Sequence, residues 1–380
     1  MVTGKPMPAS IALSLMLMSV QSAFAGPAPK DAVFVKAATE EIDRIAREDG
    51  FSGTIILAYD GKPVVRLAKG LQDRQQKLPN RLDTSFPIES DTKQFTAAAI
   101  LLLRQEGRLK LSDPISRYYQ DMPPGLPPIS IAQLLTHSAG IVDCKPCGDA
   151  NFRDYKDLIA QSLQNKPAFP SGTGMLYSNA GYGLLAIAIE KVSGLSYAEF
   201  LQQRFFSPLG MTGTGSGREP AAMAHGYFCR GGQESCREGT GANLEKMAGF
   251  GGVHSTVDDM LRWTHALEQG TVLSAQSREE MFRDYGHGYG FGWYLSEKMG
   301  RKLIWHTGSD GQAGYSSVVD IFPHERVTVI ALTNNTGLSH GKATLTIDGK
   351  PVTIPASPMR EAVDQIEKMY FDSGRRKEGG

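Results

Sequence analysis

The segments of this chain that favour β-structure gather near its two ends, and this distribution constrains the fold more than any other feature. Near the N-terminus, runs rich in β-branched residues at 52–59 and 64–68 are joined by Asp60-Gly61, a pair typical of tight hairpin turns. Near the C-terminus, extended segments are predicted at 289–295, 303–306, 315–321 and 326–333. If these strands form one sheet, the two ends of the chain pair with each other.

The middle of the chain has the apolar periodicity of helices, interrupted by loops that contain Pro and Gly. This helical stretch runs from about Thr92 to about Leu267. The clearest helices are predicted at 92–105, 182–192 and 257–267, in addition to an opening helix at 32–48 and a closing helix at 357–371. A second Asp-Gly pair, Asp348-Gly349, predicts a small accessory hairpin at 344–352.

These patterns together predict an α+β fold. An antiparallel sheet formed from the N- and C-terminal segments is flanked by helices, and a mainly helical region is inserted between its two halves. We expect the sheet region at about 30–75 and 285–371 and the helical region at about 85–284, within a single domain of residues 26–380. A site in the crevice between the two regions draws residues from distant parts of the sequence.

The first residues predict export. Lys5 precedes an apolar stretch at 11–20, and Ala23-Phe-Ala25 supplies the small residues of a cleavage site, so residues 1–25 are predicted to be a signal peptide. The apolar stretch is shorter than the roughly 20 residues that cross a bilayer. A membrane anchor and a disordered leader are the alternatives. We expect a periplasmic or secreted mature protein without a membrane span.

The four cysteines form two local pairs. Cys144 and Cys147 enclose Lys-Pro, and Cys229 and Cys236 flank a polar, Gly-rich loop. Two local disulfides are expected in an oxidising compartment. A zinc site and free thiols are the alternatives, although the second pair is spaced too widely for a zinc knuckle. We predict structural disulfides and neither a metal nor an organic cofactor.

The charge balance bears on the binding partners. Forty Lys plus Arg residues balance forty Asp plus Glu residues, so the formal net charge is zero. No basic excess is present to hold a phosphate backbone, and nucleic acid is not an expected partner. We expect a small molecule or a short peptide as substrate. The sequence does not predict the oligomeric state.

The first candidate for chemistry is Ser90-Asp-Thr-Lys93, directly before a strongly helical stretch. A serine at a helix start and a lysine one turn later lie on the same face, and the helix N-terminus offers N–H groups to a developing oxyanion. Lys93 either favours the Ser90 alkoxide as an ammonium or accepts its proton as an amine. In isolation the pattern is more typical of a helix N-cap with a solvated lysine, and it recurs as Ser339-His-Gly-Lys342.

Two further motifs follow. Tyr177-Ser-Asn179 lies between a polar turn and a predicted helix, where a tyrosine can relay a proton between Ser90 and a leaving group and an amide can bind substrate or lysine. His306-Thr-Gly-Ser ends an apolar strand, where Gly308 permits close approach of a ligand to the backbone. Taken singly, these motifs are more typical of a helix cap and a turn.

In this order the three motifs resemble the signatures Ser-x-x-Lys, Tyr-x-Asn and Lys-Thr-Gly of the serine β-lactamase and penicillin-binding protein superfamily. The resemblance is greatest to the branch that holds class C β-lactamases, secreted DD-carboxypeptidases and related esterases. It runs from about Asp49 to about Asn335 and includes the segments Lys93–Ile100, Leu134–Gly140, Pro208–Met211 and Gly251–Thr256. We interpret these segments as structural, and His137 as a packing or hydrogen-bonding residue.

The resemblance implies a role for each motif residue. The catalytic residues it implies are Ser90 as the acylated nucleophile, Lys93 as its proton partner and Tyr177 as general base. The substrate-binding residues it implies are Asn179, His306, Thr307, Gly308 and Ser309. The backbone N–H groups of Ser90 and Ser309 form the implied oxyanion hole, and water then hydrolyses the acyl-enzyme.

One departure from the family pattern bears on the substrate, because His306 stands where β-lactamases commonly have lysine. A neutral imidazole holds a carboxylate less firmly than an ammonium does. This argues against efficient β-lactamase activity and leaves D-amino-acid peptides and esters without a carboxylate open. Because DD-carboxypeptidases and other hydrolases of the branch also have histidine at this place, the resemblance implies a serine hydrolase that leans to D-amino-acid peptides, as a DD-carboxypeptidase does. Carboxylesterase and class C-type β-lactamase are the enzymatic alternatives. Outside enzymes, the alternatives are a slowly acylated penicillin-binding sensor and, with the least support, a redox or zinc-binding protein.

Overall fold

A six-stranded antiparallel sheet lies at the centre of the computed structural model, which describes residues 29–144, 152–229, 236–310, 312–337, 342–347, 350–355 and 357–374. The strand order is β10-β11-β12-β13-β1-β2. The strands are β1 (Gly53–Tyr59), β2 (Lys62–Lys69), β10 (Tyr294–Lys298), β11 (Arg301–Asp310), β12 (Tyr315–Phe322) and β13 (Val327–Thr333). Because β1 pairs with β13 along its whole length, the N- and C-terminal segments meet inside one sheet.

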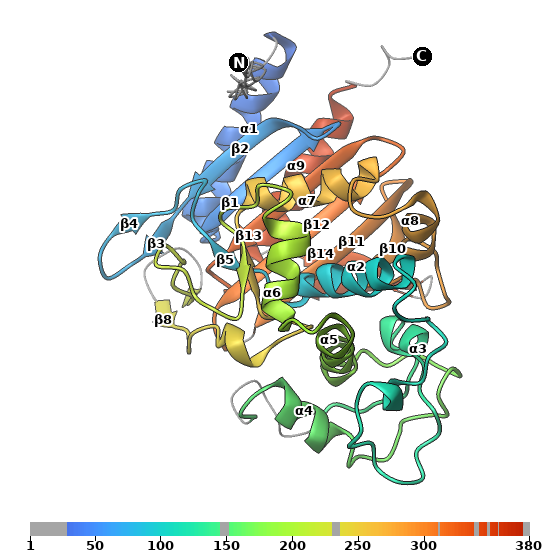
Figure 1. The fold of residues 1–380 in the computed structure, drawn as a ribbon. Helices are drawn as coiled ribbons and strands as arrows, with labels where there is room; N and C mark the ends of the chain where they lie inside the picture. The colour runs from blue at the N-terminus through green and yellow to red at the C-terminus, as the bar shows by residue number, and fades with distance from the viewer. Residues whose placement is uncertain are drawn as a thin grey trace, which may run out of the picture.

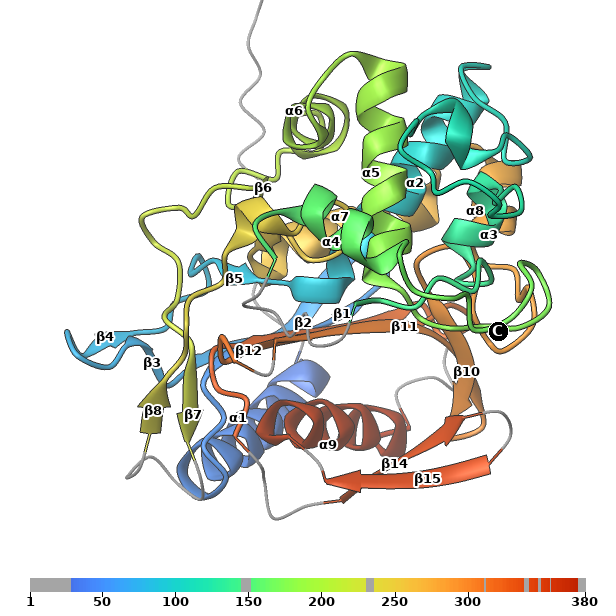
Figure 2. The same cartoon turned by 90° about the horizontal axis from the view of Figure 1, so that it is seen from below.

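Side chains alternate between the two faces of the sheet along its central strands. Both faces are apolar, because each carries side chains of a hydrophobic cluster. On β1, Ile55 and Leu57 belong to one hydrophobic cluster, and Ile56 belongs to the other. The first face is covered by α1 (Pro29–Glu48) and α9 (Pro358–Asp372), which lie side by side (Figures 1 and 2). The helical region covers the second face, and Figure 2 shows the sheet between these two layers.

The helical region is built around α2 (Thr92–Gln105) and α5 (Asn179–Ser193), which pack against each other. The other helices of this region are α3 (Ile131–Leu135), α4 (Tyr155–Ser162), α6 (Tyr197–Leu201), α7 (Val257–Gln269) and α8 (Ala275–Met281). Short strands complete the described chain: β3 (Leu71–Asp73) with β4 (Leu78–Pro79), β5 (Phe86–Pro87) with β9 (Val253–Ser255) and β6 (Gly215–Ser216), β7 (Tyr227–Cys229) with β8 (Cys236–Glu238), and β14 (Lys342–Ile347) with β15 (Lys350–Pro355).

The predicted α+β fold is confirmed, including the hairpin at Asp60-Gly61 and the pairing of the two ends of the chain. One predicted strand is wrong in its first part, because the segment 289–295 becomes extended only at Tyr294. The preceding residues form a turn, in which Gly290 N–H donates to the Trp293 carbonyl at 2.8 Å. Gly292 has φ of 77°, and a Cβ there would lie 2.7 Å from the Lys93 carbonyl oxygen. The turn therefore packs directly on α2.

The disulfide predicted between Cys229 and Cys236 is present, and it joins β7 to β8. Cys144 is disulfide-bonded as well, whereas Cys147 lies outside the described residues. The predicted signal peptide at 1–25 and the second Ser-x-x-Lys serine, Ser339, also lie outside them. Across the described part of the chain, the helices are too short or too polar to cross a bilayer.

Candidate active site

Ser90 lies in η1 (Glu89–Asp91), a single 3-10 turn that leads directly into α2. The chain bends sharply before it, since Glu89 has φ of 49°, a left-handed conformation that non-glycine residues rarely adopt. Strand β11 lies close against this turn: a Cβ on Gly308 would stand 2.1 Å from the Ile88 carbonyl oxygen. The glycine that was expected to admit a ligand thus makes room for the segment that carries the serine.

Lys93 is fully buried one helical turn after Ser90. Its Nζ lies 3.1 Å from Ser90 Oγ and 2.9 Å from Asn179 Oδ1. It also donates to the Phe250 carbonyl oxygen at 3.0 Å. None of these three partners carries a formal charge, and burial lowers the pKa of Lys93 from 10.5 to about 7, although nearby carboxylates oppose this shift. A substantial fraction of Lys93 is therefore a neutral amine at neutral pH and can accept a proton.

Tyr177, the first residue of the Tyr177-Ser-Asn179 motif, also contacts Ser90. A hydrogen bond links its hydroxyl to Ser90, and its ring centroid lies 4.6 Å from Lys93 Nζ. The His137 ring packs on the Tyr177 ring, with centroids 4.3 Å apart. Burial raises the pKa of Tyr177 well above 10, so its hydroxyl keeps its proton at neutral pH.

Asn179 is the first residue of α5, three residues before the helix predicted at 182–192, and Ser178 is its N-cap. The amide oxygen of Asn179 accepts from Lys93, as described above, while its backbone N–H donates to Asp143 Oδ2 at 2.7 Å. Ser178 Oγ and the Ala180 N–H donate to the other carboxylate oxygen at 2.6 Å and 3.1 Å. The carboxylate of Asp143, which lies in a distant loop, therefore accepts hydrogen bonds from the first turn of this helix.

The His306 side chain is only 1% exposed. Its Nδ1 lies 2.9 Å from the Thr307 carbonyl oxygen, which can only accept, so Nδ1 carries the proton. Nε2 then accepts, and it faces the Tyr289 hydroxyl at 3.4 Å. Burial, with a smaller contribution from Lys93, lowers the pKa of His306 to about 3. The ring is therefore neutral and offers no cation to a substrate.

Thr307 and Ser309 point to the opposite side of β11, where both are exposed. The Thr307 hydroxyl donates to the Ser317 carbonyl oxygen at 2.7 Å. Strand β10 pairs with β11 only as far as Trp305, so β10 leaves one edge of residues 306–310 uncovered. The oxyanion hole formed by the N–H groups of Ser90 and Ser309 remains a prediction.

The structure thus brings together the three motifs that the sequence separates by more than two hundred residues. The sequence profile of the Beta-lactamase family matches residues 40–348. This chain belongs to the beta-lactamase family. It is a serine hydrolase of the penicillin-binding and β-lactamase type, as its motifs predicted.

Two curated relatives of this beta-lactamase-family chain are informative. It is 30% identical to Penicillin-binding protein 4* of Bacillus subtilis (strain 168), over 87% of this chain and 79% of the relative. It is 26% identical to the D-alanyl-D-alanine-carboxypeptidase/endopeptidase AmpH of Escherichia coli (strain K12), over 83% and 90%. The crystal structure of a penicillin-binding protein from Bacillus halodurans superimposes with a TM-score of 0.66 at 26% identity, over 81% and 95% of the two chains.

Sequence reasoning missed the buried acids of this beta-lactamase-family site, of which Asp91 is the more deeply buried. It follows Ser90 and is fully buried, and it accepts hydrogen bonds from Gln94 Nε2 at 2.8 Å and Ser317 Oγ at 2.5 Å. Burial raises its pKa to about 7. An aspartate at a helix start is typical of an exposed cap, so the sequence contained no signal of this burial.

It also missed the aromatic surroundings of His306. The rings of Tyr289 and Tyr294 lie 6.2 Å and 5.3 Å from the imidazole, measured between centroids. Both tyrosines belong to the segment predicted as a strand, and the turn at 289–293 is what directs Tyr289 towards the site.

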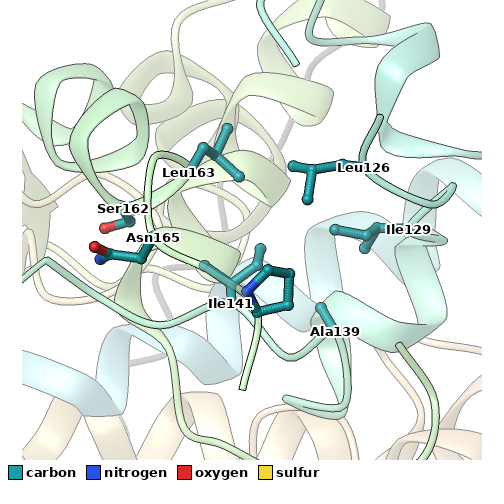
Figure 3. Close-up of a pocket in the computed structure, with 8 residues that line it drawn as sticks. Leu126, Ile129, Ala139, Ile141, Ser162, Leu163 and Asn165 are labelled. Carbon is teal, nitrogen blue, oxygen red and sulfur yellow. The ribbon is translucent and has the colours of Figure 1, made fainter. Parts of the chain in front are cut away.

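Two hollows of the helical region lie apart from these residues. A cavity of about 20 Å³ is lined by Leu126, Ile129, Ala139, Ile141, Ser162, Leu163, Asn165 and Pro167 (Figure 3). An adjoining hollow of about 370 Å³ shares part of this apolar lining and reaches Phe169 and Ser171. Neither is lined by Ser90, Lys93 or Tyr177.

Proposed function

We propose that this protein hydrolyses an amide or ester bond through an acyl-enzyme on Ser90. The observation that carries the proposal is the 3.1 Å contact between Ser90 Oγ and the buried amine of Lys93, whose pKa is about 7. Neutral Lys93 takes the hydroxyl proton while Oγ forms a bond to the carbonyl carbon. The carbonyl electron pair moves to its oxygen, where the N–H groups of Ser90 and Ser309 stabilise it.

Tyr177 then completes the proton transfer to the leaving group. Because its pKa is raised well above 10, a resting phenolate is unfavourable, and Lys93 is the first proton acceptor in this proposal. The Tyr177 hydroxyl donates its proton to the leaving nitrogen or oxygen and regains one from Lys93. The C–N or C–O bond breaks, and water attacks the acyl-enzyme with the same groups acting in reverse.

The proposed substrate is a short peptide that contains D-amino acids. One support is the relative named a D-alanyl-D-alanine-carboxypeptidase/endopeptidase, which matches most of this chain. A second is the edge of β11 beyond Trp305, which β10 leaves uncovered beside Ser90, since an extended peptide can pair with such an edge. Asn179 and Thr307 then orient the peptide by hydrogen bonds.

A carboxylesterase is the second candidate, and the state of His306 favours it. A neutral, buried imidazole gives no cationic contact, and a simple ester needs none. A β-lactam and a D-Ala-D-Ala peptide both carry a carboxylate that profits from such a contact. The peptide stays first because of the named relative and the uncovered strand edge, and β-lactamase activity, which has neither support, is placed last.

The proposed compartment is the periplasm or the cell exterior. The predicted signal peptide at 1–25 and the disulfide between Cys229 and Cys236 support it, because disulfides persist in oxidising compartments.

The test is a panel assay of the purified mature protein with a p-nitrophenyl ester, a D-Ala-D-Ala peptide and a chromogenic cephalosporin. We expect turnover of the peptide or ester to exceed that of the cephalosporin, and Ser90→Ala to abolish turnover and covalent labelling. Ser339→Ala, in the second Ser-x-x-Lys sequence, is the matched control and retains activity. A folded Ser90→Ala protein with full activity contradicts the mechanism, and acylation without turnover of any substrate supports the sensor alternative.

A further inference from the structure

We infer that Asp143 is a positioning residue for this chemistry: it fixes the first turn of α5 so that Asn179 holds Lys93 beside Ser90. The inference rests on the acyl-enzyme function proposed above. Asp143 does not touch the serine in the described contacts, and it acts through two intervening residues.

The Asp143 carboxylate is bound tightly to the helix. Three donors meet its two oxygens: the Ser178 hydroxyl, the Asn179 N–H and the Ala180 N–H, at 2.6, 2.7 and 3.1 Å. The first N–H groups of a helix have no partners within the helix, and the positive end of the helix dipole favours an anion there. Asp143 therefore determines where the first turn of α5 sits.

A short chain of contacts leads from this carboxylate to the nucleophile. Asn179 is held through its backbone by Asp143, and its side-chain oxygen accepts from Lys93 Nζ at 2.9 Å. Lys93 Nζ in turn lies 3.1 Å from Ser90 Oγ. A shift of the helix start by a fraction of an ångström moves the amide oxygen by a similar distance, and the lysine loses one of its three partners.

Asp143 is itself held by its own loop. The N–H of the next residue, Cys144, donates to Ser162 Oγ at 3.0 Å, and Cys144 is disulfide-bonded. Earlier in the loop, His137 Nδ1 accepts from the Ser178 N–H at 3.1 Å. The loop thus holds the Tyr177-Ser-Asn179 segment at two points, which suits a positioning role.

The charge of Asp143 also acts on Lys93, since it opposes the effect of burial and raises the pKa of the lysine. Other groups close enough to influence or be influenced by this lysine are Glu89 and Asp91 in η1, His306 on β11, His137 after α3, and the rings of Tyr177 and Tyr182. Removing the Asp143 charge therefore favours the neutral amine and lowers the pH at which Lys93 loses its proton.

The decisive variant is Asp143→Asn in the full mature protein. The amide replaces one acceptor oxygen by an N–H₂ group, so one of the three donors loses its partner. We expect kcat for a p-nitrophenyl ester to fall about 10- to 100-fold, because small misplacements of catalytic groups have effects of this size. KM changes less, and the acidic limb of the pH–rate profile moves to lower pH. Asp143→Glu keeps the charge but not the geometry, so kcat falls while the limb stays in place.

Asp154 provides the control, because this exposed carboxylate also accepts from N–H groups at a helix start, although it is itself the N-cap residue of α4 and lies outside the site. Its Oδ1 accepts from the N–H groups of Lys156 and Asp157, both at 2.9 Å. Asp154→Asn is expected to lower the thermal midpoint without altering kcat or the pH–rate profile. If Asp143→Asn behaves like this control, or if Asp143→Glu retains full kcat, Asp143 has no positioning role. A failure of the proposed function shows instead as activity in Ser90→Ala, which is independent of Asp143.

Discussion

Two lysines lie in the interior regions of this molecule, and their surroundings differ sharply. Lys93 contacts a hydroxyl and two amide-type oxygens, and burial lowers its pKa to about 7. Lys298, at the end of β10, contacts Asp320, Asp364 and Glu367, which lie on β12 and α9. Burial acts to lower the pKa of Lys298 as well, but the carboxylates outweigh it, and the pKa is raised above 10.5.

The comparison shows that burial alone does not make a lysine reactive. Both side chains lose most of their contact with water: Lys93 is 0% exposed and the Lys298 side chain is 20% exposed. The difference lies in the charge of their partners, because carboxylates favour the ammonium and neutral oxygens do not. One lysine is prepared to accept a proton, and the other is a permanent charge that joins α9 to the sheet.

The largest expected effect comes from removing the reactive lysine. Lys93→Met eliminates the proton acceptor for Ser90, and we expect acylation to slow about 10⁴-fold or more, as when a member of a catalytic unit is lost. Lys298→Met leaves the rate per folded molecule within about a factor of two. Stopped-flow acylation by a p-nitrophenyl ester measures both. Equal losses in the two variants would remove the distinction between the lysines.

The same assay tests whether Lys93 and Tyr177 act together. Tyr177→Phe removes the hydroxyl that passes the proton on, so the double variant should be little slower than the slower single variant. Losses in log rate that add in full would mean that the two residues do separate work.

The next effect concerns the free energy of unfolding, for which we expect the Lys298 substitution to cost more than the Lys93 substitution. Lys298→Met leaves Asp320 and Glu367 buried with one cation fewer, and we expect about 3–5 kcal/mol of unfolding free energy to be lost. Arg360, which contacts Asp320 at 2.8 Å, compensates in part. Lys93→Met replaces a poorly solvated amine by an apolar side chain and should be neutral or stabilising. Urea denaturation of both variants decides, and a larger loss for Lys93→Met contradicts this prediction.

A third lysine can be introduced beside the first. His306→Lys places an ammonium where the neutral imidazole lies, and we expect the ratio of cephalosporin to ester kcat/KM to rise. The rise corresponds to about 1–3 kcal/mol of added transition-state stabilisation for the cephalosporin, the contribution of a hydrogen bond to a charged group. His306→Gln is the neutral control and leaves the ratio unchanged. A wild-type enzyme that strongly prefers cephalosporins and does not respond to either variant shows that His306 does not determine selectivity.

Much of the fold was predictable because local patterns determine it. The Asp60-Gly61 turn, the β-branched run of β1 and the apolar periodicity of 92–105 each depend on neighbouring residues alone. The turn at 289–293 was not predictable, because its conformation comes from packing of Gly292 on α2. The motif residues could be named from the sequence, but their electrostatics could not. The burial of Asp91 and the contact of Lys93 with the Phe250 carbonyl depend on distant segments.

The last prediction uses pH to separate the two lysines. Lys93 must be neutral to accept a proton, so kcat/KM for a neutral ester should rise about tenfold per pH unit below pH 7 and level off above it. His306, with a pKa of about 3, contributes nothing in this range. Asp91 also titrates near pH 7, and Asp91→Asn separates the two: the limb moves to lower pH if it belongs to Lys93 and disappears if it belongs to Asp91.

The contributions of the two lysines to the free energy of unfolding change with pH in opposite directions. The pKa of Lys93 is lower in the folded than in the unfolded chain, so the unfolded chain binds more protons between about pH 7 and 10.5, and the Lys93 contribution rises with pH across that window. The pKa of Lys298 is raised, so its contribution is fully present below pH 10.5 and is lost as the pH rises through the folded value. Urea unfolding between pH 7 and 10 should therefore show a rise with pH that Lys93→Met removes and Lys298→Met retains. A rise that persists in Lys93→Met would mean that another buried group, and not the catalytic lysine, loses the proton.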